Sequence, residues 1–247
     1  MAIRTVFDDG YSERPERRAL SSAVRFALVT GPLRWLIATH QVAGGEPVRR
    51  ACPECDTPLW PSVGNPSGRC PFGHRVGAPA GLVEVLVVVS AVLVALLPGP
   101  RPAAAFWLGC AIVLGIIDGL VHRLPLKLVG VMAGGTTVLL ALDAALSGRW
   151  DNLIRAGLAA ATLGGVLFLL CLPRNGFGLG DAALAVPIGL IAGWFGWSTV
   201  LAWVLLWSTL AGIAGVALLV LGRASRKSRI PLGPYMRIAT VLAVAIS

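Results

Sequence analysis

Long apolar runs, separated by short stretches rich in Gly, Pro and Arg, fill the C-terminal two thirds of the chain and restrict what it can fold into. As an α-helix, a run of roughly 20 residues crosses a hydrocarbon core of about 30 Å. The runs cover residues 82–97, 103–117, 128–146, 153–172, 182–195, 199–221 and 235–247. The last is too short to cross without tilting or thinning of the bilayer. The sequence therefore predicts an all-α, polytopic transmembrane helical bundle with six spans and a marginal seventh.

Charged residues make up only 13% of the 247, and they are concentrated toward the N-terminus. Residues 1–75 contain seven of the 12 acids and ten of the 21 Lys and Arg residues. We therefore expect three parts. These are a cytosolic tail with a candidate interfacial helix (1–45), a Cys/His zinc-binding segment (46–78) and a transmembrane domain (79–247).

Basic residues in the loops predict the orientation, because Lys and Arg are retained on the cytoplasmic side of a membrane. One set of alternate loops carries eight: Arg123, Lys127, Arg174, Arg223, Arg226, Lys227, Arg229 and Arg237. The opposite set carries three: Arg101, Arg149 and Arg155. We therefore expect a multi-pass protein of the cytoplasmic membrane with its N-terminal region in the cytosol. Four tryptophans then fall near the outer interface, where indole rings prefer to lie: Trp107, Trp150, Trp194 and Trp197.

Residues 20–43 are moderately apolar but carry Arg25, Pro32, Arg34 and His40. Charged side chains at the centre of a bilayer are costly, so we expect an interfacial amphipathic helix here rather than a span. If the segment does span, the first 18 residues lie outside the cell and the rest of the topology is unchanged.

Three of the five cysteines lie in residues 51–75. Cys52 and Cys55 form a C-x2-C pair, and a Pro- and Gly-rich loop leads from them to Cys70 and His74. Three thiolates and one imidazole complete a tetrahedral zinc shell, and disulfides are disfavoured in the cytosol. We therefore predict a structural Zn²⁺ that cross-links a segment with few large apolar side chains. The alternatives are a redox dithiol at Cys52 and Cys55, or incidental thiols.

Five acids lie in the membrane half of the chain, where an ionisable side chain indicates function by default. Glu84 and Asp151 open helices, where a carboxylate caps free N–H groups, and Asp143 lies near the outer end of its run. Asp118 ends one run and Asp181 opens another, with two spans between them. Both therefore return to the same cytoplasmic level, and these two are our candidate catalytic residues.

Two carboxylates at one depth in a partly dry site suit the acid–base hydrolysis of a peptide bond, a reaction that needs no cofactor. Close like charges do not both ionise, so one carboxyl polarises the scissile carbonyl while its partner activates water. Gly176, Gly178 and Gly180 precede Asp181 and allow the backbone to approach an extended substrate. The alternative is that each Asp caps a helix at the membrane interface.

Four features, taken in their order along the chain, resemble those of the type IV prepilin peptidases. This family belongs with the presenilin-like intramembrane aspartyl proteases. The stretch Gly178-Leu179-Gly180-Asp181 matches their G-x-G-D motif. Asp118, followed by Leu124-Pro125, resembles their first catalytic aspartate with its downstream Leu/Ile-Pro. Residues 230–234, Ile-Pro-Leu-Gly-Pro, are similar to the I-P-F-G-P stretch before their last helix, and the cysteine cluster is the fourth feature. The resemblance covers about residues 50–240 and implies a divergent, actinobacterial-type member.

This resemblance implies a membrane aspartyl endopeptidase with Asp118 and Asp181 as its catalytic pair. Its substrates would be prepilin-like precursors, Tad-type pilins among them, cleaved at the cytoplasmic membrane face in type IV pilus assembly or protein secretion. The implied partners are these precursors and membrane lipids.

Several positions depart from the family pattern. Ala182-Ala183 stand where the family commonly has Val-Lys, Leu126 stands where Asp or Asn often follows the Pro, and His74 replaces a second C-x2-C cysteine. The first transmembrane helix, with its Gly-Ser-Phe-Asn type motif, is not recognisable, so the N-methylation tied to that part is not carried over. A second hypothesis is therefore a non-catalytic, degenerate scaffold that holds a partner or anionic lipid.

Two further classes are disfavoured. The net charge of +9 is dispersed over loops without aromatic interleaving, so we expect lipid headgroups rather than nucleic acid as the anionic partner. A rhomboid-type serine protease needs a serine in a G-x-S-x-G-like setting and a His within the membrane. The sequence has no such serine, and the only His after residue 75 is His122 in a predicted loop.

Overall fold

The fold is that of a computed structural model of the chain, which describes residues 15–42, 47–62, 67–97, 99–121, 124–172, 178–221 and 232–247. Apart from two isolated bridges between residues 51 and 75, the regular structure in these ranges is helical, which confirms the predicted all-α class. The helices are α1 (Pro15–His40), α2 (Leu59–Ser62), α3 (Leu82–Leu96), α4 (Arg101–Val121), α5 (Leu126–Ser147), α6 (Trp150–Cys171), α7 (Leu179–Phe195), α8 (Trp197–Val220) and α9 (Gly233–Ala245).

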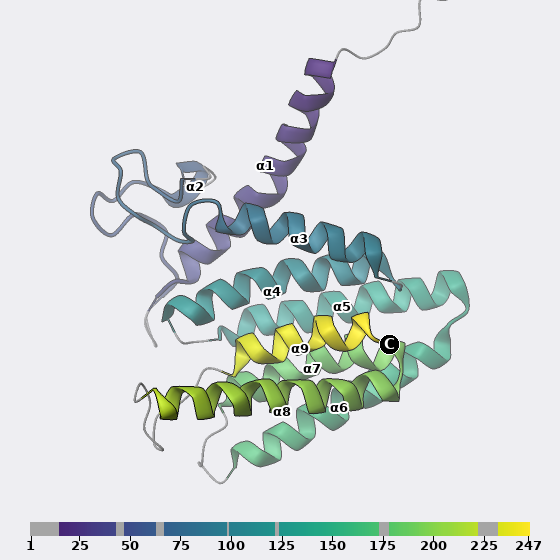
Figure 1. Cartoon of the computed structure of the whole chain (residues 1–247). Helices are drawn as coiled ribbons and strands as arrows, with labels where there is room; N and C mark the ends of the chain where they lie inside the picture. Colours follow the sequence, from purple (N-terminus) through teal and green to yellow (C-terminus); the bar gives the residue numbers. More distant parts are fainter. Residues whose placement is uncertain are drawn as a thin grey trace, which may run out of the picture.

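Helices α3 to α9 coincide with the seven apolar runs, and no end differs by more than four residues. Four of them, α4, α5, α6 and α8, are long and apolar enough to cross a membrane. Helices α3 and α7 have 15 and 17 residues, and α9 has 13. In Figure 1 these seven helices lie roughly side by side, as expected for a polytopic membrane protein.

Small residues hold α7, the helix that carries Asp181, closely against α6. Gly189 and Gly193 lie four residues apart on α7, and an added Cβ at Gly189 would lie 2.5 Å from the Cα of Ala160 on α6. An added Cβ at Gly193 would lie 2.5 Å from the Cβ of Ala159. Small residues at this spacing let helix backbones approach, which is how helices associate within membranes.

We expect Gly189→Leu to destabilise the bundle by about 1–3 kcal/mol, because the new side chain has no space between α6 and α7. The matched control is Gly157→Leu on α6, where an added Cβ meets nothing within 4 Å among the described residues. Thermal unfolding of the detergent-solubilised protein measures both changes. Equal melting temperatures for the two variants would contradict this account of the α6–α7 contact.

Helix α1 is continuous over 26 residues and is not among the four helices that meet the criteria for a span. Its N-terminal part extends away from the bundle in Figure 1, while its C-terminal part packs on α3 and α4 through Ile37. The predicted 20–43 helix thus ends at His40. Its location at the membrane interface stays a prediction.

One ion pair anchors α1 to the start of α3. Arg34 is 0% exposed, and its Nε and Nη2 donate to the Glu84 carboxylate at 2.7 and 2.5 Å. Nη1 and Nη2 also donate to the carbonyl oxygens of Ala78 and Pro79, each at 3.3 Å. Glu84 lies in the first turn of α3, as predicted, but it also neutralises a buried cation of α1.

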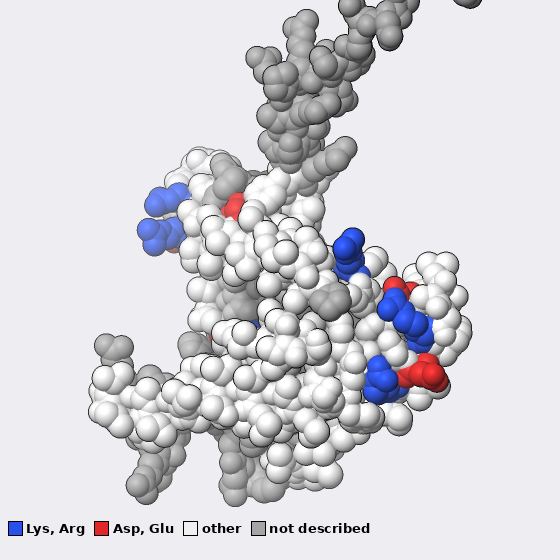
Figure 2. All heavy atoms as spheres, turned by 45° about the vertical axis from the view of Figure 1, so that its right-hand side comes forward, with Lys and Arg blue, Asp and Glu red and all other residues white. Residues whose placement is uncertain are grey.

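The charged side chains visible in Figure 2 gather toward two ends of the molecule, and the surface between is almost entirely uncharged. At the junction of α5 and α6, Arg149 pairs with Asp143 at 2.7 Å. Trp107 and Trp194 are each only 2% exposed and pack inside the bundle, while their level near the outer interface stays a prediction. The Trp107 indole donates to the Pro187 carbonyl oxygen at 3.0 Å, so the bundle itself satisfies its polar atom.

Much of the basic loop sequence used to predict the orientation lies outside the described residues, and so do His122, Gly176, Ile230 and Pro231. The basic residues concerned are Arg123, Arg174, Arg223, Arg226, Lys227 and Arg229. Arg237, which the sequence analysis counted as a loop residue, instead lies within α9 and is buried. Without Arg237, the set predicted to be cytoplasmic has seven basic residues and the opposite set has three. The predicted orientation is therefore unchanged.

Candidate active site and metal site

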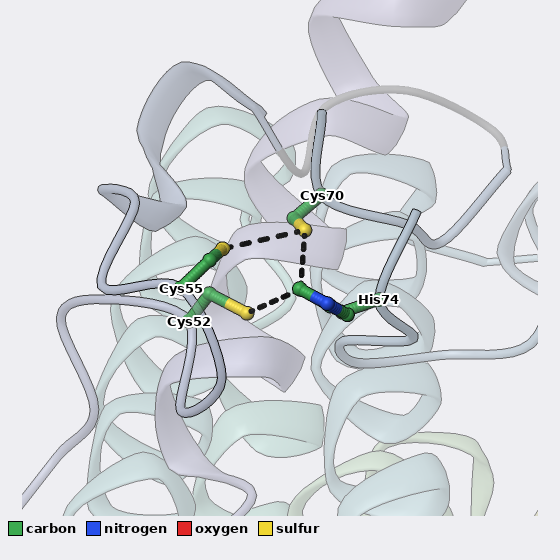
Figure 3. A group of neighbouring side chains, drawn as sticks. All are labelled: Cys52, Cys55, Cys70 and His74. Carbon is green, nitrogen blue, oxygen red and sulfur yellow. Dashed lines mark hydrogen bonds between the residues drawn. The ribbon is translucent and has the colours of Figure 1, made fainter. Parts of the chain in front are cut away.

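Cys52, Cys55, Cys70 and His74 form one cluster, as the spacing predicted, and their ligand atoms all lie within 4.8 Å of one another. Two tight turns supply them in pairs (Figure 3). In the first, the Cys52 amide donates to the Thr57 carbonyl at 2.9 Å, and in the second the Cys70 amide donates to the His74 carbonyl at 2.9 Å. Each turn thereby points two ligands at one centre.

The distances within the cluster fit a four-coordinate metal. Tetrahedral bonds of about 2.3 Å to sulfur and about 2.0–2.1 Å to nitrogen place sulfurs about 3.8 Å apart and sulfur and nitrogen about 3.5 Å apart. The Cys55 and Cys70 sulfurs are 3.7 Å apart, and His74 Nδ1 lies 3.4 Å from the Cys70 sulfur and 3.8 Å from the Cys52 sulfur. The cluster can therefore hold a metal ion.

The surroundings prepare these ligands for a cation. The hydroxyl and backbone of Thr57 lower the pKa of the Cys55 thiol to about 6, so this group is largely thiolate at neutral pH. Burial raises the pKa of the Cys52 thiol. On the far side of the imidazole, His74 Nε2 lies 3.3 Å from a Glu54 carboxylate oxygen. Such a carboxylate orients a metal-binding histidine and increases its basicity.

The cluster packs on the C-terminal part of α1. Cys52, Cys70, Leu59 and Val76 form a small buried core with Ala38 of α1. Trp60 also meets Trp35 of α1 edge to face, with ring centroids 6.2 Å apart. The position of the Cys/His segment on the bundle therefore depends on α1.

Asp118 lies in the last turn of α4 and is 6% exposed. A carboxylate at a helix C-terminus is opposed by the helix dipole, so the alternative that Asp118 caps a helix has no support here. Its described partner is Arg237 on α9, whose Nη2 donates to Asp118 Oδ2 at 3.4 Å. Gly233, at the start of α9, makes room for this carboxylate, because an added Cβ would lie 2.6 Å from Oδ2.

Asp181 lies in the first turn of α7 and is half-buried. Its Oδ2 accepts a hydrogen bond from the Gly178 amide at 3.3 Å, so Asp181 caps its own helix, as the alternative interpretation proposed. An added Cβ at Gly180 would lie 3.1 Å from the Leu124 Cβ, so the chain before α5 occupies the space beside this glycine. An approach of substrate to Gly178 and Gly180 stays a prediction.

Asp118 and Asp181 are close enough for their charges to interact, and Arg237 interacts with both. Helix α9 packs against both α4 and α7, which brings the three charged residues to the same end of the bundle. Arg237 was not among the catalytic candidates named from the sequence. The available signal was its position as the sole cation of the apolar run 235–247. A cation within such a run needs a buried acid as its partner.

Two other acids of the membrane half lie away from this site. Asp143 pairs with Arg149 and Asp151 lies exposed in the first turn of α6, both at the end of the bundle opposite to Asp118. Cys110 and Cys171 lie in α4 and α6, outside the metal cluster, and the Cys171 thiol donates to the Gly178 carbonyl oxygen at 3.4 Å.

Comparison with known proteins gives three similar curated proteins and no match to a family model. No solved structure matches at the same stringency. A "Prepilin leader peptidase/N-methyltransferase" of Aeromonas salmonicida (strain A449) is 30% identical over 214 residues, which cover 79% of this chain and 70% of that protein. The protein of the same name from Aeromonas hydrophila is 30% identical over 209 residues, 79% of this chain and 71% of that protein. The chain therefore belongs to the type IV prepilin peptidase family.

Proposed function

We propose that this protein is a membrane aspartyl endopeptidase that removes the leader peptides of prepilin-like precursors, Tad-type pilins included. The observation that carries the proposal is the position of two aspartates, Asp118 at the end of α4 and Asp181 at the start of α7, at the same end of an apolar bundle. Its relatives bear the name of prepilin leader peptidase, which supports the same substrate class.

The chemistry is the hydrolysis of one peptide bond by one water molecule. One carboxylate of the pair takes a proton from water, and the water oxygen attacks the scissile carbonyl carbon. The partner carboxyl polarises the carbonyl oxygen. The C–N bond then breaks, and a proton passes from the pair to the leaving nitrogen. When two carboxyl groups act on one peptide bond in this way, the protons belong to the pair rather than to one residue.

The reaction would take place at the cytoplasmic face. Seven basic residues in the loops and helix ends on the Asp118 and Asp181 side, against three on the other, support that orientation. A prepilin leader is short and precedes a long apolar helix, so the apolar surface of the bundle suits the rest of such a substrate. The names of the relatives also include N-methyltransferase. Our proposal is confined to cleavage, because the N-terminal motif tied to methylation is not recognisable in this sequence.

For the metal site we propose a structural Zn²⁺ bound by Cys52, Cys55, Cys70 and His74. Zinc prefers tetrahedral sulfur and nitrogen ligands, and four protein ligands leave no position for a reacting water molecule. When bound, the ion would cross-link the two turns of the Cys/His segment. The aspartate pair does not depend on it for its chemistry.

Membranes that contain the wild-type protein are expected to shorten a solubilised prepilin-like precursor by the length of its leader. Mass spectrometry and N-terminal sequencing of the product measure the cut and identify the new first residue. Membranes from cells without the protein are the control. If type IV and Tad-type precursors all remain intact, the proposal is wrong and the non-catalytic scaffold is favoured.

A further inference from the structure

Arg237 lies within the membrane half of the protein, and the proposed reaction of the two aspartates gives no reason for a buried arginine there. It lies in α9 and is 7% exposed. A buried guanidinium is costly unless hydrogen bonds and charges compensate it. Its ion pair with Asp118 gives part of that compensation, at 3.4 Å through Nη2.

Its other terminal nitrogen, Nη1, is buried and has no hydrogen-bond partner within the described ranges of the chain. Buried polar atoms are almost always hydrogen-bonded, and an exception in a native protein calls for an explanation. Nη1 and Nη2 are bonded to the same carbon, so the unpaired donor lies next to the nitrogen that binds Asp118. A donor in this position can bind an oxygen of a molecule that enters the site.

The local packing shapes the site around the guanidinium. An added Cβ at Gly115 of α4 would lie 3.6 Å from the Nε, Cζ and Nη2 atoms of Arg237. An added Cβ at Gly233 would lie 3.4 Å from Nη2. Both neighbours lack side chains, so the planar group can reach Asp118 from α9. At the same time, α7 places Ala182 and Ala183 directly after Asp181 and offers no cation there.

We infer that Arg237 is a third catalytic residue, which holds Asp118 through Nη2 and donates a hydrogen bond from Nη1 to the carbonyl oxygen of the scissile peptide bond. This inference rests on the proposed function. The family commonly has a lysine where Ala183 stands in this chain. Arg237 supplies a positive charge near the two aspartates from a different helix.

The role of Arg237 begins with the attack of water. The new O–C bond pushes the carbonyl π electrons onto oxygen, the base carboxylate takes the water proton, and Nη1 donates to the oxyanion. When the intermediate collapses, the C=O bond forms again, the C–N bond breaks and the nitrogen takes its proton from the aspartate pair. Arg237 neither gains nor loses a proton. A donor of this kind contributes about 10²–10³ to kcat.

Arg237→Met is therefore expected to lower kcat for precursor cleavage by about 10²–10³-fold, with a KM within a few-fold of wild type. Arg237→Lys keeps a charge beside Asp118 but has a single nitrogen. We expect it to recover part of the rate and to remain about tenfold below wild type. Arg155→Met is the control, because Arg155 also caps carbonyls within the bundle, those of Gly193 and Trp194, but lies at the opposite end. Its kcat should equal that of the wild type.

Three results would each overturn the inference. One is a kcat within threefold of wild type for Arg237→Met, and another is full wild-type activity for Arg237→Lys, since charge alone would then suffice. The third is failure of both variants to accumulate, which would assign Arg237 to folding. All rates are compared with a wild-type protein that cleaves. A wild-type protein that does not cleave contradicts the proposed function instead, and the two failures are thereby distinguished.

Discussion

Asp181→Asn is expected to lower kcat for leader cleavage by about 10²–10⁴-fold, the range that acid–base catalysis by one positioned side chain contributes. The substitution keeps the shape of the side chain, and the amide oxygen can still accept the hydrogen bond from the Gly178 amide that begins α7. Helix capping is thus preserved while the carboxyl is lost. The initial rate of precursor shortening, divided by the amount of folded protein, measures the effect.

Asp118→Asn should cause a loss of the same size, but it also leaves the buried Arg237 without its ion pair. Breaking a buried pair costs about 3–5 kcal/mol, so this variant should also melt at a lower temperature. Asp143→Asn is the matched control. Asp143 lies near the C-terminal end of α5, at the end of the bundle opposite to Asp118, and pairs with the half-exposed Arg149. Normal cleavage by either Asp118→Asn or Asp181→Asn would remove that residue from the catalytic pair.

Loss of one metal ligand should have the second largest effect. We expect Cys70→Ser to abolish zinc retention and to unfold the segment 47–78, because zinc binding to small domains of this kind contributes about 10–16 kcal/mol. The small core of this segment does not replace a contribution of that size. Zinc content per protein by elemental analysis should fall from one to none, and limited proteolysis should cut within the segment.

Cys110→Ser is the control for the metal experiment, because Cys110 lies in α4 outside the cluster. It should retain zinc at the wild-type level. A purified wild-type protein without zinc, or a Cys70→Ser variant that keeps it, would show that the cluster is not a zinc site.

The helices could be predicted from the sequence because the bilayer imposes their length and composition one segment at a time. A run such as 128–146 is apolar enough to be a membrane helix whatever its neighbours are, and α5 covers all of it. The metal cluster could be predicted for a similar local reason. Cys52 and Cys55 share one turn and Cys70 and His74 share another, so the chain spacing already brings each pair together.

The partners of individual side chains could not be predicted in this way. The sequence did not reveal that Trp107 and Trp194 are buried, which follows because their helices turn these side chains toward the bundle. Arg34 and Glu84 lie 50 positions apart and meet only because α1 packs on the start of α3. A one-dimensional pattern contains no information on which faces of two helices come into contact.

The sequence by itself therefore determined the class of the protein, the limits of its membrane helices, the Cys/His cluster and the two candidate aspartates, since each depends on composition or short spacing. Only the tertiary structure decided that Asp118 is buried beside a cation from the last helix while Asp181 caps its own helix. Arg237 lies 119 positions from Asp118, and the packing of α9 against α4 and α7 closes that distance. The charge next to the aspartate pair is thus a property of helix packing, which adjacent residues in the sequence do not reveal.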